Sequence, residues 1–115
     1  MLPSGVNTTK KTTKLTLDEL SDWAKQNGEG TFTYDTAEQP EAFFRCALTL
    51  RFTRLFVDEF SRIVSFTDNT GNCMTLIGVI AASLDECGGN SILTVQCRRD
   101  PLLGNRDIYV FKKLS

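Results

Sequence analysis

The sequence contains no histidine. This absence excludes Ser-His-Asp and Cys-His catalysis, zinc sites of the HExxH type, iron sites built from histidines and a carboxylate, and a histidine pH switch. The adjacent acids Asp58-Glu59 and Asp85-Glu86 do not replace it, because neighbouring residues on a strand point to opposite faces. We therefore expect a protein that is not an enzyme and that uses no cofactor or metal.

Closely spaced cysteine pairs are also missing. The C-x-x-C spacing that is common in zinc sites and redox pairs does not occur. The pattern favours reduced thiols in a cytosolic protein, and the alternative is one or two disulfides in a secreted domain. Four cysteines allow three pairings, so the sequence leaves the choice open. They are Cys46, Cys73, Cys87 and Cys97.

Long apolar runs and a dominant charge are lacking as well. No run reaches the roughly 20 residues that span a bilayer, and the first residues lack the basic and apolar segments of a secretory signal. The net charge is −1, so no overall field attracts the chain to nucleic acid or membrane. A chain of 115 residues is expected to be one domain, here cytoplasmic and without a membrane partner.

The N-terminal part divides into a tail and a helix. Residues 1–14 are rich in Thr and Lys and show no apolar period, which predicts a disordered tail before a single α+β domain at residues 15–115. Thr16 and Glu19 match a capping box, and Gly28 marks the helix end. The helix face expected to pack on a sheet comprises Leu17, Leu20, Trp23 and Ala24.

The apolar stretch Met74–Ala82 lies between turn-rich segments and predicts a strand that is covered on both faces, with the sheet built around it. For residues 41–57 strand is preferred, with a change of phase near Arg54, and helix is the alternative. Short connections favour antiparallel neighbours. The fold expected is α+β: a curved antiparallel sheet of five or six strands, or a small barrel, with the N-terminal helix against it. Further strands are predicted at Thr31–Tyr34, Phe44–Thr53, Ser61–Thr67, Ile92–Arg98 and Ile108–Lys112.

Charge is unevenly distributed. Residues 17–41 carry seven acids and one lysine, which suits a solvated face or a docking surface for a protein with a basic surface. The protein-binding residues predicted there are Asp18, Asp22, Trp23, Glu29, Asp35 and Glu38.

Arginines define a competing interpretation. If the sheet gathered them beside an aromatic ring, they would suit single-stranded nucleic acid, although the chain as a whole is not basic. They are Arg45, Arg51, Arg98, Arg99 and Arg106.

Together these patterns predict a small non-catalytic protein that acts by macromolecular binding. The favoured function is a protein-binding inhibitor or adaptor of the phage or mobile-element type, an association that rests on size and on the lack of motifs. The alternatives are a nucleic-acid-binding module and a structural subunit that self-assembles into a homo-oligomer through unpaired strand edges.

Overall fold

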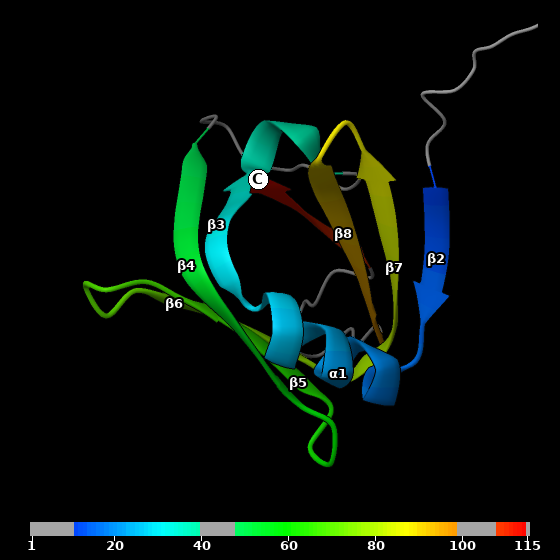
Figure 1. Cartoon of the computed structure of the whole chain (residues 1–115). Coiled ribbons are helices and arrows are strands. Elements are labelled where there is room, and N and C mark those ends of the chain that lie inside the picture. The colour runs from blue at the N-terminus through cyan, green and yellow to red at the C-terminus, as the bar shows by residue number, and fades with distance from the viewer. Residues whose placement is uncertain (1–10, 40–47, 99–107, 115) are drawn as a thin grey trace, which may run out of the picture.

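The computed structural model describes residues 11–39, 48–98 and 108–114 (Figure 1). They form one antiparallel sheet of eight strands in the order β2-β7-β8-β9-β3-β4-β5-β6, with one α-helix. The elements are β2 (Lys11–Leu15), α1 (Leu17–Asn27), β3 (Glu29–Asp35), the 3-10 helix η1 (Thr36–Glu38), β4 (Thr49–Asp58), β5 (Ile63–Thr67), β6 (Cys73–Ile77), β7 (Val79–Cys87), β8 (Asn90–Cys97) and β9 (Ile108–Leu114).

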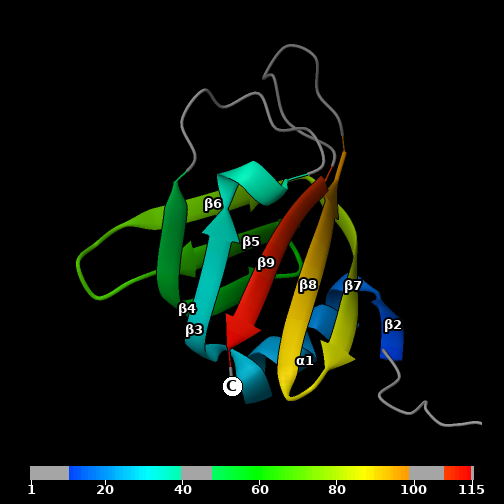
Figure 2. The same ribbon diagram turned by 90° about the horizontal axis from the view of Figure 1, so that it is seen from above.

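The predicted α+β class and antiparallel sheet are confirmed. The sheet curves strongly, and α1 lies across one end of its concave side, where it contacts β4 and β7 (Figure 1). Figure 2 shows β3, β9 and β8 side by side, with β5 and β6 running crosswise behind them. The predicted number of five or six strands is wrong. Among residues 11–39, 48–98 and 108–114, β2 and β6 end the sheet on either side, so the sheet that they form is not a closed barrel.

The helix forms where its local signals place it. The Thr16 hydroxyl accepts a hydrogen bond from the Glu19 amide at 3.2 Å, and the Glu19 carboxylate accepts one from the Thr16 amide at 3.0 Å, which completes the capping box. At the other end, a Cβ on Gly28 would lie 2.8 Å from the carbonyl oxygen of Leu55. The Leu55 amide donates to the Gly28 carbonyl at 2.7 Å, so the absence of a side chain lets the chain pass close to β4.

The stretch Met74–Ala82 is not one strand. It breaks at Gly78, whose φ of 72° is favourable for glycine and costly for other residues. The corner is held by the Val79 amide, which donates to Arg62, and by the Gly78 carbonyl, which accepts from Arg98. β6 therefore becomes an edge strand and β7 joins the opposite flank. The expectation of cover on both faces is wrong, because Ile77 and Ile80 are 54% and 45% exposed.

The predicted tail also needs correction. Lys11–Lys14 belong to β2, which pairs with β7 from Lys11 opposite Glu86 to Leu15 opposite Ala82. Residues 1–10 lie outside the described residues. Nothing in the local composition of a Thr- and Lys-rich segment signals a strand, because the pairing partner is about 70 residues away along the chain.

β4 supports the strand interpretation and refines it. Residues 49–58 are a strand, so the helix alternative is wrong there, while residues 41–47 fall outside the described residues. The expected change of phase near Arg54 is confirmed, because Phe52 and Leu55 are both buried although three positions separate them. The other predicted strands coincide with β3, β5, β8 and β9.

The core is aromatic at its centre. Phe66 stacks on Phe111 with 3.8 Å between ring centroids. Phe32 and Phe52 pack on the same Phe66 ring at 5.5 Å and 5.9 Å. These rings come from four consecutive strands of the sheet, β9, β3, β4 and β5. Burial of large rings provides much of the hydrophobic stabilisation of such a small domain.

Candidate functional site

The predicted acidic residues do not form one surface. Asp18 and Asp22 are exposed on α1, and Glu29 begins β3. Asp35 ends the same strand, about 20 Å away at the usual rise per residue. Its carboxylate accepts a hydrogen bond from the Ala37 amide at 3.0 Å, so Asp35 caps η1. Glu38 lies in η1 at that far end as well.

Trp23 is a packing residue. Its ring is half-buried against the core. The Nζ atom of Lys113 lies 5.5 Å from the ring centroid, within the range of a cation–π contact. The same Nζ donates to the carbonyl oxygen of Asn27 at 2.7 Å. These contacts join β9 to α1. They cover part of the Trp23 ring, so Trp23 is less accessible to a binding partner than the sequence analysis predicted.

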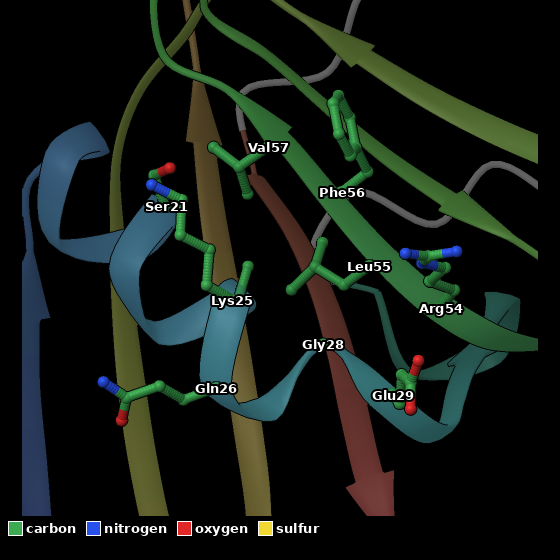
Figure 3. Close-up of a pocket in the computed structure, with 10 residues that line it drawn as sticks. Ser21, Lys25, Gln26, Gly28, Glu29, Arg54, Leu55, Phe56 and Val57 are labelled. Carbon is green, nitrogen blue, oxygen red and sulfur yellow. The ribbon is translucent and has the colours of Figure 1, made fainter.

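A groove separates the end of α1 from β4 (Figure 3). Its volume is about 450 Å³. Leu55 and Val57 point toward the helix, while Phe56 lies on the other side of β4. Charged side chains surround this groove, and one of the predicted acids is among them. The polar residues that line the groove are Ser21, Lys25, Gln26, Glu29 and Arg54.

The arginines of the competing interpretation are only partly described. Arg51 is exposed on β4, and Arg98 is exposed just after β8. β9 and β3 separate these two strands in the sheet. Within the described ranges, the structure therefore does not bring the predicted basic residues together. Arg45, Arg99 and Arg106 lie outside those ranges.

An exposed apolar surface occurs where the sequence analysis placed none. We call it the outer apolar face: Phe56, Ile63 and Ile77 on one side of β4, β5 and β6, together with Phe60 on the turn between β4 and β5. Phe60 is 93% exposed and Phe56 is 61% exposed. Ile63 and Ile77 are directly opposite each other on β5 and β6, and Phe56 is opposite Ser65 on the same side of the sheet. Contiguous exposed apolar surface of this kind marks interaction sites in many proteins.

The turn that carries Phe60 is fixed by hydrogen bonds. The Asp58 carboxylate accepts from the amides of Phe60 at 3.1 Å and Ser61 at 3.2 Å. Arg62 completes the turn with a φ of 57°. Phe60 is thus presented to solvent by an ordered turn. In the sequence, Phe56 continues the apolar alternation of Leu50 and Phe52, and the change of phase near Arg54 turns it outward.

A larger cavity, of about 740 Å³, opens at the end of the sheet where β4 begins. Leu48 and Leu50 line it and are 49% and 38% exposed. Phe52, which follows them at the next alternate position of the strand, is buried. Tyr34, Met74 and Tyr109 contribute other apolar walls of this cavity.

The chemistry available on these surfaces is limited. Among the described residues, no group of three or more His, Cys, Asp or Glu side chains converges as a metal site would require. Cys73 is exposed and Cys97 is buried, and neither forms a disulfide. The described helix is too short and too polar to cross a bilayer. No protein-family model, curated protein or solved structure matches this chain.

Proposed function

We propose that this chain is a non-catalytic protein-binding module that contacts its partner through the outer apolar face. The observation that carries the proposal is the 93% exposure of Phe60 on a turn that Asp58 holds in place. Covering an exposed Phe, Leu or Ile side chain contributes roughly 1.5–3 kcal/mol. Aromatic residues at the centre of interfaces are frequent hot spots.

Charge on the neighbouring elements would orient the partner. Glu29 is opposite Arg54, which lies two residues from Phe56 on the same side of β4. Asp18 and Asp22 extend negative charge along the exposed side of α1. A partner with an apolar centre and a basic margin fits this arrangement, and the acids would act mainly on its association rate. Small size and the lack of a reactive centre suit an inhibitor or adaptor of the phage or mobile-element type, acting in the cytoplasm.

Affinity capture with matched variants tests the proposal. The partner is captured from extracts of the source cell with the wild-type chain, purified, and its affinity measured for each variant. The Phe56→Ser, Phe60→Ser double variant should weaken binding by at least about tenfold, which corresponds to 1.4 kcal/mol. Leu114→Ser is the control, because Leu114 is 47% exposed but lies on β9.

A second variant separates the charge from the apolar contact. A triple variant with three charge reversals should slow association with a basic partner more than it speeds dissociation. This effect should decrease with added salt. The three substitutions are Asp18→Lys, Asp22→Lys and Glu29→Lys. Unchanged affinity in a folded double-Phe variant would contradict the proposal. Loss of affinity in Leu114→Ser alone would place the interface elsewhere.

A further inference from the structure

The two edges of the sheet differ in character. In the described part of the chain, β6 pairs only with β5, and β2 pairs only with β7. A strand edge offers backbone N–H and C=O groups to another strand, and natural proteins commonly protect it with charge, proline or a bulge. β2 carries Lys11 and Lys14. β6 reads Cys-Met-Thr-Leu-Ile and has no charge and no proline.

We infer that β6 pairs with β6 of a second copy of this chain, in an antiparallel arrangement around a two-fold axis at Thr75. This inference rests on the proposed protein-binding function and names one partner for the edge of the same surface. Two-fold homodimers are the commonest protein assemblies, and their interfaces bring the same patch of both subunits together. Extending a sheet at an exposed edge is also a recurrent mode of protein recognition.

The register follows from the faces of β6. Cys73, Thr75 and Ile77 are exposed on the outer side, whereas Leu76 is buried. Centring the pair on Thr75 is the arrangement that overlaps all five residues, and it keeps outer side chains beside outer side chains. Ile77 would then lie opposite Cys73 of the partner subunit. This contact would cover part of the 54% of the Ile77 surface that is exposed.

Charged residues lie at both ends of β6, and none lies within the strand. Asp68 is at the Cys73 end, where its carboxylate accepts hydrogen bonds from Asn72. The turn at the Ile77 end carries Asp58 and Glu59 as well as Arg62. Antiparallel pairing would place Asp68 about three strand spacings, or 14 Å, from Arg62 of the partner subunit. This distance exceeds the roughly 8 Å over which exposed charges interact at physiological salt, so the inference rests on the uncharged backbone edge of β6 and not on these charges.

Sedimentation of the purified chain is the first test. The apparent mass should rise from one copy toward two between about 5 and about 500 μM, since a short strand pair gives a small and weak interface. Ile77→Lys should shift the midpoint of this transition to at least about tenfold higher concentration. Leu114→Lys is the matched control, because Leu114 is similarly exposed on another strand, and it should leave the midpoint unchanged.

A covalent trap identifies which edge is used. In a Cys73→Ser background, Thr75→Cys should form a disulfide-linked dimer under mild oxidation, because residue 75 faces residue 75 of the partner subunit. Thr12→Cys in the same background places the thiol on the exposed side of β2 and should link at least about tenfold more slowly. The Cys73→Ser background alone corrects for the remaining cysteines.

The outcomes separate the inference from the proposed function. A chain that stays monomeric over the whole concentration range overturns the inference, as does a dimer that Ile77→Lys leaves intact or that links faster through Thr12→Cys. If the chain is monomeric but the double-Phe variant still loses its captured partner, the protein-binding function stands without this dimer. If the double-Phe variant keeps that partner, the proposed function fails whatever the oligomeric state.

Discussion

Replacing Phe66 with alanine removes a fully buried ring that touches three others. Its centroid lies 3.8 Å from that of Phe111, and the rings of Phe32 and Phe52 lie within 6 Å. A buried Phe→Ala change costs about 3–5 kcal/mol, and three ring contacts place this residue at the upper end of that range. Domains of this size have a free energy of unfolding of about 5–15 kcal/mol. Phe66→Ala is therefore expected to lose about 4–5 kcal/mol.

Phe60→Ala is the matched control. It deletes the same ring from a position that is 93% exposed, where substitutions usually change stability by no more than about 0.5 kcal/mol. Urea unfolding of both variants, followed by circular dichroism and Trp23 fluorescence, gives the two free-energy differences. A loss below about 1.5 kcal/mol for Phe66→Ala would show that the ring stack is not the centre of the core. A loss above about 1 kcal/mol for Phe60→Ala would show that Phe60 is packed rather than presented.

Three other variants test local features. Thr16→Ala removes the helix cap and should cost about 1 kcal/mol, measured as a lower urea midpoint. Gly78→Ala forces a φ of 72° on a residue with a Cβ and should cost about 1–2 kcal/mol in the same assay. Desolvation raises the pKa of Asp68, but hydrogen bonds from Thr70 and Asn72 outweigh it and lower the pKa below 3.8. The stability that depends on the carboxylate is present above pH 3.8 and is lost as the pH falls through the lower folded value, so the Tm difference between wild type and Asp68→Ala should shrink in that acidic range.

Features fixed by neighbours in the sequence were predictable. The capping box needs only Thr16 and Glu19, three residues apart. The alternation of β8, with Leu93, Val95 and Cys97 buried, follows from the period of a strand. In both cases the residues that decide the structure lie within one element, and the sequence carries the whole signal.

Features fixed by distant partners were not predictable. β2 exists because it pairs with β7, and an isolated Thr- and Lys-rich segment gives no sign of this. The break of Met74–Ala82 depends on Gly78. From the sequence alone, this glycine is compatible both with a small residue inside a strand and with a corner between two strands. Hydrogen bonds from Val79 to Arg62 and from Arg98 to Gly78 decide for the corner. Strand order is likewise a property of the whole chain.

The candidate interface shows the same division. Composition pointed to exposed acids, and Asp18, Asp22 and Glu29 are indeed exposed, but Asp35 serves the backbone of η1. Phe60 was missed because a single aromatic residue in a turn is ambiguous without its surroundings. The structure reveals the outer apolar face in two ways. The hydrogen bonds of Asp58 fix the turn that carries Phe60, and Phe56 and Ile77 are exposed on the same side of the sheet.

The corner at Gly78 has a mechanical consequence. The same continuous stretch of backbone serves the last strand on one flank and the second strand on the other. Gly78 alone connects β6 to β7. Because this connection is so short, neither flank can move away from the core without displacing the other. The rolled shape is thereby tethered against flattening, and the two flanks are expected to melt together rather than in succession.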